Sequence, residues 1–261
     1  MPAICSPRAV VLVAALTAVT SSPAADLSVD EVREILSRST AAQPASLAGK
    51  DLSDLALSNM DFRKANLAGA NLFGARLVSS NFEGANLTRA NLNGAWLMGA
   101  NFNGADLSGC SMLSLVIAGG PVKEKPNFAG ANLSGARMIA DLPATDFHGA
   151  NLSRAKLGVD IKNQGMGQMR TDLSGANLAG ANLQDADLNR ALLLFANLTG
   201  ADLRRANLYR SKLSGADLTG ADVSEADFTE ADLDRTIFTR AKGIDSAKGM
   251  NQATNRDRAV Y

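Results

Sequence analysis

The stretch that decides the fold is residues 176–233, ANLAG ANLQD ADLNR ALLLF ANLTG ADLRR ANLYR SKLSG ADLTG ADVSE ADFTE ADL. Alanine, then Asn or Asp, then Leu returns every five residues, and the same pattern runs through residues 52–112. In an α-helix, Leu at every fifth position would step round by roughly 140° and form no apolar stripe. In a flat strand, an odd period would send successive Leu residues to opposite faces. The pattern therefore predicts a chain that turns a corner in every repeat.

The positions within one repeat have different roles in such a chain. Ala and Leu lie two residues apart and share the inward face, so the Asn or Asp between them points outward. The two residues after Leu form the corner, where Gly tolerates the backbone angles of a tight turn. The Ala position should admit only small residues, because added methylenes in a packed interior cost about 1–3 kcal/mol. Small residues stand there at Ser80, Cys110, Ser211 and Thr236, and larger ones at Leu55, Met60 and Leu115.

The repeat A-[DN]-[LF]-x-x resembles that of the pentapeptide-repeat family over residues 47–240. The resemblance implies an all-β solenoid, a right-handed quadrilateral β-helix with four repeats in each square coil. At that ratio the chain would form about eight coils, stacked roughly 4.8 Å apart into a rod about 40 Å long. A short N-terminal capping helix is expected to cover the first coil, since the end of a solenoid exposes apolar groups and unpaired strand edges.

The N-terminus indicates export. Within residues 1–25, Arg8 is followed by the apolar run AVVLVAALTAV and then by small residues. This order of positive charge, short apolar run and small residues is typical of a secretory signal peptide, and the run is too short to span a bilayer. Cleavage is expected near Ala24 or Ala25, which predicts a periplasmic or secreted protein with no membrane span in the mature chain.

The ends of the repeat array are expected to differ from each other. Residues 26–46 predict a capping helix and a linker, with Ser28 and Glu31 placed as a capping box. The same helix could instead bind a partner. Residues 241–261 are polar and weakly periodic, so they are expected to be a loosely held cap or a disordered end.

The repeats break register at three places, near residues 118–127, 139–146 and 158–172, which are expected to be irregular insertions. The third, GVDIKNQGMGQMRT at 158–171, departs from the pattern completely. Loops on rigid scaffolds are where binding residues concentrate, although a loop packed over one face by its Met residues is the alternative. The candidate partner-contact residues are Asp160, Lys162, Asn163, Gln164, Met166, Met169 and Arg170.

The last repeats are acidic. Between Gly215 and Asp234 the sequence contains no Lys or Arg, and with twenty residues per coil Asp202 would lie under Asp222. Stacked carboxylates of this kind could attract Ca²⁺ or a basic partner, and a solvated surface is the alternative. The candidate acidic face consists of Asp202, Asp217, Asp222, Asp227 and Asp232.

Composition excludes several classes of function. Lys and Arg total 26, as do Asp and Glu, so no basic surface for nucleic acid is expected. Aromatic residues make up 5% of the chain, too few for a platform on which bases stack. The single histidine, His148, has no predicted metal-binding partner, and Cys110 occupies an inward position where a small thiol fits. No cofactor, metal or enzymatic activity is therefore expected.

The sequence favours an exported, non-catalytic scaffold that binds a protein partner, because rigid repeat rods present long faces to partners. The family resemblance supplies an alternative, since some of its members resemble B-form DNA and bind DNA gyrase. The near-neutral charge and the leader depart from that alternative. A metal-binding or enzymatic role for the 158–171 loop is a further alternative, because Met suits copper(I). The partner and the oligomeric state are not specified by the sequence.

Overall fold

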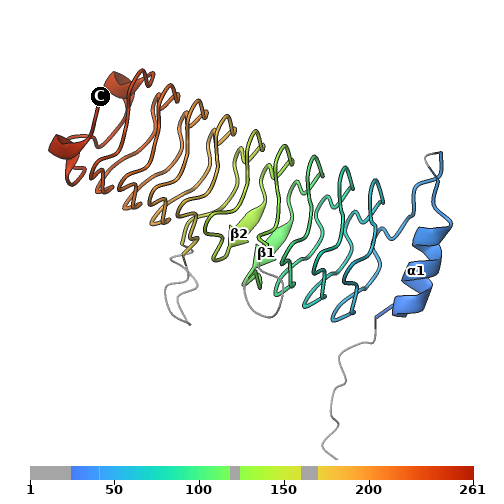
Figure 1. Ribbon diagram of the computed structural model, residues 1–261. Helices are drawn as coiled ribbons and strands as arrows, with labels where there is room; N and C mark the ends of the chain where they lie inside the picture. The colour runs from blue at the N-terminus through green and yellow to red at the C-terminus, as the bar shows by residue number, and fades with distance from the viewer. Residues whose placement is uncertain (1–24, 41, 118–123, 160–169) are drawn as a thin grey trace, which may run out of the picture.

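The chain winds into a long stack of similar coils, with a helix at one end and the C-terminus at the other (Figure 1). The structure is a computed structural model that describes residues 25–40, 42–117, 124–159 and 170–261. In chain order its elements are α1 (Val29–Ser37), β1 (Ser111–Leu113), β2 (Arg137–Ile139), η2 (Ile244–Ser246) and η3 (Arg256–Arg258).

Each coil pairs with the next through single parallel bridges. In one coil Asn66, Asn71, Arg76 and Asn81 occupy the bridging positions, one on each of four faces. Each pairs with the residue twenty positions later, so successive coils lie in register; for example, Asn71 lies below Asn91. Strands β1 and β2 are the place where this parallel pairing lengthens into a two-stranded sheet. The four-sided coil that the family resemblance implied is thus confirmed.

The corners are tight turns with a left-handed residue in a fixed place. At Leu72 the carbonyl accepts the Ala75 N–H at 3.1 Å, and the intervening Gly74 has φ 64°. A four-residue turn with positive φ at its third position is the arrangement of a type II turn, which favours Gly. Several corners place other residues there, including Arg205 with φ 56°. Such residues cost stability, because a Cβ crowds the backbone in this region.

The interior is filled by Leu, Phe and Ala from all four faces. One inward column is a ladder of aromatic rings, in which Phe62 stacks on Phe82 at 4.7 Å between centroids and Phe82 on Phe102 at 4.8 Å. Small polar residues at the Ala position are buried; Ser80 donates to the Leu57 carbonyl at 2.7 Å, whereas the Thr145 hydroxyl has no hydrogen-bond partner in the described part of the chain. The larger exceptions, Met60, Leu115 and Leu55, lie buried or partly buried against the core.

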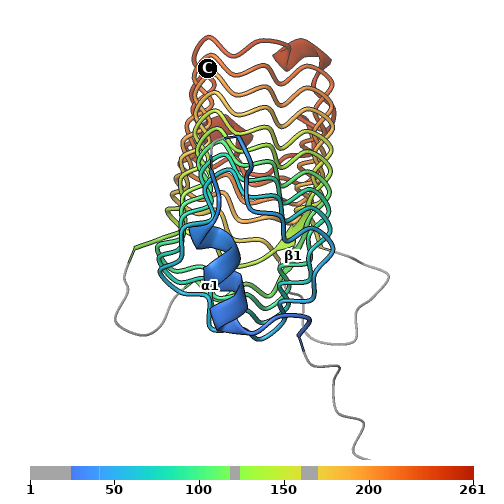
Figure 2. The ribbon, with the colours of Figure 1, turned by 90° about the vertical axis from the view of Figure 1, so that its right-hand side faces the viewer.

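Helix α1 covers the first coil as predicted. Ser28 caps its N-terminus: its side chain accepts from the Glu31 N–H, and the Glu31 carboxylate accepts from the Ser28 N–H at 2.7 Å. Val32 is fully buried against the core. Figure 2 shows the helix lying across the end of the stack, in front of the first coils. None of the helices in the described part of the chain has the length and hydropathy that a membrane span needs.

The three breaks of register change the number of residues in a coil, and they do so in different ways. The first lengthens one coil, since Asp106 pairs with Asn132, and the third lengthens another, since Asn151 pairs with Asn182. The middle break, at residues 139–146, was expected to be an insertion, and this expectation is wrong. Asn132 pairs with Asn151, nineteen positions on, so this coil is one residue short instead.

The C-terminal tail is a further coil, which corrects the expectation of a loosely held or disordered end. Lys242 pairs with Asp222, and Val260 pairs with Ile237, so the stack extends beyond the 47–240 range for which about eight coils were expected. The ring of Tyr261 stacks on Phe238 at 5.5 Å and continues the aromatic interior to the last residue. Helices η2 and η3 form two of the corners of this coil.

Candidate functional site

The outward Asn and Asp side chains are used mainly to build the coil. The Asn66 Oδ1 accepts the Ala68 N–H at 3.1 Å, which is the local hydrogen bond of an Asx-turn, and this contact recurs along the array. The amides also bond between coils, as Asn91 Nδ2 donates to Asn71 Oδ1 at 2.9 Å. These polar columns therefore stabilise the stack and leave few side-chain groups free to bind a ligand.

The candidate acidic residues do not form one face. Successive bridging positions lie on different sides of the coil, so only Asp202 and Asp222 share a side, and Asp217, Asp227 and Asp232 lie on the other three. Asp202 lies below Asp222, and Asp217 and Asp227 each accept a backbone N–H two residues on, at 2.8 and 2.9 Å. The Arg204 guanidinium lies 2.6 Å from Asp202 and holds the pKa of that carboxyl below its usual value. Lys212 lies 3.4 Å from Asp232.

The expectation that the last acidic residues meet no basic partner is therefore wrong. The partners come from neighbouring coils: Arg210 pairs with Glu230 at 2.7 Å, and Arg258 pairs with Asp234 at 2.9 Å. In the described residues, no group of three or more His, Cys, Asp or Glu side chains is arranged to hold a metal ion. The acidic residues thus give no support to a calcium site.

The candidate contact loop lies mostly outside the described residues. This applies to Asp160, Lys162, Asn163, Gln164, Met166 and Met169, whose predicted role stays a prediction. Arg170 is described and exposed, and with Val159 it lines a hollow of about 430 Å³ on the side of the stack. We call this hollow the basic hollow, because its other lining residues are Arg190, Arg210, Lys212 and Glu230.

Cys110, His148 and Trp96 are side chains that could have a reactive or binding role, and the structure shows what surrounds each of them. Cys110 is buried and its Sγ donates to the Leu87 carbonyl at 2.9 Å; burial raises the pKa of this thiol to about 12. His148 is exposed at a corner, where its backbone N–H donates to Asp146 Oδ1 at 3.0 Å. Trp96 is half-buried under Arg76, whose guanidinium carbon lies 4.8 Å from the ring centroid.

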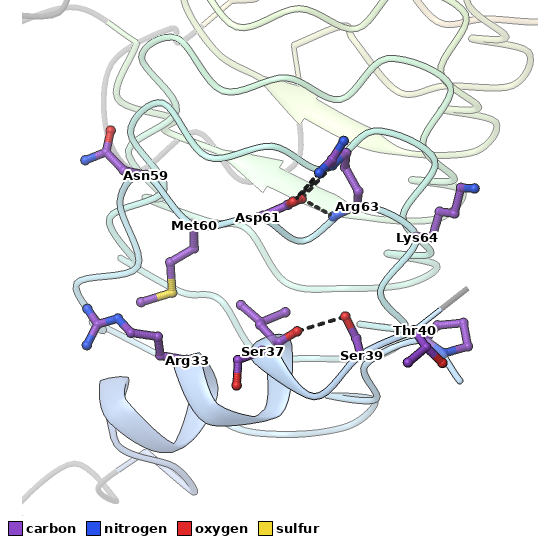
Figure 3. A pocket seen from close by; sticks show the side chains of 11 residues that line it. Arg33, Ser37, Ser39, Thr40, Asn59, Met60, Asp61, Arg63 and Lys64 are labelled. Carbon is purple, nitrogen blue, oxygen red and sulfur yellow. Dashed lines mark hydrogen bonds and ion pairs between the residues drawn. The ribbon is translucent and has the colours of Figure 1, made fainter. Parts of the chain in front are cut away.

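A second hollow, the N-terminal groove, lies between α1 and the first coil (Figure 3). Its volume is about 730 Å³, and Met60 points into it from the coil toward the helix. Arg33 enters from α1, while Arg63 and Lys64 lie along the opposite side. Arg63 is held to Asp61 at 2.6 Å. Neither hollow was predicted, because each depends on which segments lie side by side in space.

The repeat pattern described as pentapeptide repeats matches this chain in 8 copies, over residues 45–77, 75–112, 127–158, 171–210 and 211–242. The chain belongs to the pentapeptide-repeat family. Its fold is the right-handed quadrilateral β-helix of that family, as the sequence predicted. No match was found among curated proteins.

Solved pentapeptide-repeat structures resemble this one. HetL, from the cyanobacterium Nostoc sp. strain PCC 7120 and involved in heterocyst differentiation regulation, is 32% identical; the match covers 80% of this chain and 86% of HetL, with a TM-score of 0.43. The plasmid-mediated fluoroquinolone resistance protein QnrB1 is 18% identical, with 73% and 86% covered and a TM-score of 0.39. A protein from the Arabidopsis thaliana thylakoid lumen is 29% identical, with 52% and 63% covered and a TM-score of 0.23.

Proposed function

We propose that this pentapeptide-repeat protein is an exported, non-catalytic scaffold that binds a protein partner at the N-terminal end of its stack. Membership of a family of rigid repeat structures supports the scaffold role. The use of outward polar side chains in turns, ladders and ion pairs supports the absence of catalysis. The apolar leader in residues 1–25 supports export.

The observation that carries the proposal is a backbone edge in the N-terminal groove for which the described residues supply no partner. In the second coil, the Asn81 N–H donates to Met60 at 2.9 Å and its carbonyl accepts from Phe62 at 2.7 Å. The corresponding groups of Asp61 point to where a preceding coil would lie, and in the described part of the chain they have no hydrogen-bond partner. An extended segment could bond to this edge by strand addition.

The opposite face of the first coil shows what can occupy such an edge. There Asp26 supplies the missing contacts: its N–H donates to the Asp51 carbonyl at 2.8 Å, and its carboxylate accepts the Asp51 N–H at 2.8 Å. The segment before α1 therefore closes the edge at Asp51, whereas no residue that the structure describes bonds to the backbone of Asp61. The groove also presents Lys64 and Arg33 beside the apolar Leu36, which suits a segment with acidic and apolar side chains.

Site-specific photocrosslinking in cells tests the proposal. A photoreactive residue at Lys64, inside the groove, is expected to yield one discrete adduct with a protein partner. The matched control is Lys50, which is exposed on the same coil but does not line the groove. No adduct at position 64, or the same adducts at both positions, would contradict binding at the groove.

Fractionation of cells expressing a C-terminally tagged chain tests export. The expected product is periplasmic or secreted and begins near Ala25 or Asp26. A cytoplasmic product that retains Met1 would contradict export and restore the gyrase-binding alternative. That alternative predicts that the mature protein changes DNA supercoiling by purified gyrase, whereas the scaffold proposal predicts no change.

A further inference from the structure

The corner residues of the later coils form columns in which charge alternates. One column consists of Arg154, Asp185, Arg205 and Glu225, each with positive φ and each one coil above the last. Arg205 Nε lies 2.7 Å from Asp185 Oδ1, and its second guanidinium nitrogen lies 3.0 Å from the other oxygen. Alternation places an opposite charge next to every charge, so this column neutralises itself.

The neighbouring corner column breaks that alternation. It consists of Val159, Arg190, Arg210 and Glu230, again one residue from each successive coil. Arg210 pairs with Glu230 above it at 2.7 Å and lies against the Tyr209 ring at 5.0 Å. Arg190 therefore lies between a cation and a valine. Like charges on adjacent strands destabilise a sheet, and stacked coils are about 4.8 Å apart.

Arg190 also has an unsatisfied donor. Its Nε is buried, and it has no hydrogen-bond partner in the described part of the chain. Buried donors are normally paired, because leaving one unpaired costs about 1–3 kcal/mol. The basic hollow lies directly at this residue, with a volume of about 430 Å³. An orphaned guanidinium donor beside an open hollow indicates a missing acceptor.

The other charged side chains around the hollow also indicate that a negatively charged group is missing there. Arg170 and Lys212 add two positive charges, and the only carboxylate among the described lining residues, Glu230, is held by Arg210. We propose that the basic hollow binds a small oxyanion, a phosphate or a carboxylate, which completes the charge alternation above Arg190. Guanidinium groups suit this ligand, because their forked donors bond two oxygens at once. The inference is independent of a protein partner at the N-terminal groove.

The test titrates the full chain with inorganic phosphate and, separately, with succinate, against sodium chloride of equal ionic strength. Calorimetry on the wild type is expected to show saturable binding of one of the two anions, and the arm that binds identifies phosphate or carboxylate as the ligand. Arg190→Gln is expected to weaken that binding at least tenfold. Arg205→Gln is the matched control, since it removes an arginine at the same turn position in the self-neutralised column, and it should bind as the wild type does.

A stability measurement without the anion gives a second readout. Arg190→Gln removes like-charge repulsion, so its melting temperature should equal or exceed that of the wild type. Arg205→Gln removes the bond to Asp185, so its melting temperature should fall. Absence of saturable binding in both arms, or equal binding by the wild type and Arg190→Gln, would overturn the proposal. A lower melting temperature for Arg190→Gln in chloride would also overturn it, by showing that the chain itself already satisfies this arginine.

Discussion

At the scale of single residues, two positions in each repeat limit what the sequence can contain. The inward Ala position holds a small side chain in most repeats, and a polar group there can bond to a backbone carbonyl, as the Ser80 hydroxyl does at Leu57. The second corner position requires a left-handed backbone, which Gly adopts at least cost. Both requirements follow from the repeat itself, and this is why the period alone predicted the core so fully.

The corner requirement can be measured with two glycines. Gly180 has φ 64° and nothing within 4 Å of the place that a Cβ would take, so Gly180→Ala should cost about 1 kcal/mol from the backbone alone. At Gly249, with φ 68°, a Cβ would meet the backbone Cα and nitrogen of Thr229 at 2.5 Å, so Gly249→Ala should cost distinctly more. Urea unfolding of both variants checks the order, and equal losses would contradict the close approach of the Thr229 backbone to Gly249.

Cys110 gives a prediction about reactivity and pH. In a chain carrying Cys5→Ala, the Cys110 thiol should not react with a thiol reagent at pH 8 until the protein is unfolded in urea, because burial raises its pKa to about 12. The sign of its pH effect follows, since the unfolded thiol ionises near 9.0. Its contribution to stability is complete below that pH and is lost as the pH rises toward 12. Rapid labelling of the folded chain would contradict this burial.

At the scale of elements, the cap on the first coil depends on the capping box of α1. Ser28→Ala removes the acceptor for the Glu31 N–H and should lower the free energy of unfolding by about 1 kcal/mol. Ser37→Ala, at the other end of the same exposed helix, is the matched control and should be close to neutral, because Ala is the better helix former. Hydrogen exchange of α1 amides should quicken for Ser28→Ala alone. Equal protection in both variants would show that the packing of Val32 holds the helix without its cap.

The elements also show where sequence reasoning reached its limit. The period predicted the core, the family resemblance implied the four faces, and the capping box predicted the helix, because each of these signals lies within a few residues. The candidate acidic face was misjudged because charges were counted along the sequence, whereas its residues lie on four sides of the stack and Asp232 meets Lys212 of the preceding coil. The basic hollow depends on the third break of register, which places Val159 beside Arg190. Where the length of an insertion decides which residues of two coils pair, no short stretch of sequence predicts that pairing.

At the scale of the whole molecule, the two ends of the stack are closed by different means. Helix α1 covers the first coil, where no described residue bonds to the backbone of Asp61, and the last coil is built from residues that lack the repeat. The period disappears there because extra residues enter at the corners: Asp227 pairs with Lys248, and Ile237 pairs with Val260. The tail therefore forms the last coil of the stack, although its polar and weakly periodic sequence did not predict this.

A chain that ends at Arg240 tests whether the last coil stabilises the stack and keeps it from associating. Removal of residues 241–261 uncovers Phe238, which is 1% exposed in the intact protein, and leaves the preceding coil with unpaired backbone groups at Asp222 and Asp227. Open strand edges and bare apolar ends promote self-association, so the truncated chain should melt at a lower temperature and associate as its concentration rises. Scanning calorimetry and light scattering measure both effects. Asn251→Ala, an exposed change within the same coil, is the control and should alter stability by less than about 0.5 kcal/mol. A truncated chain that stays monomeric with an unchanged melting temperature would show instead that the repeats close their own end.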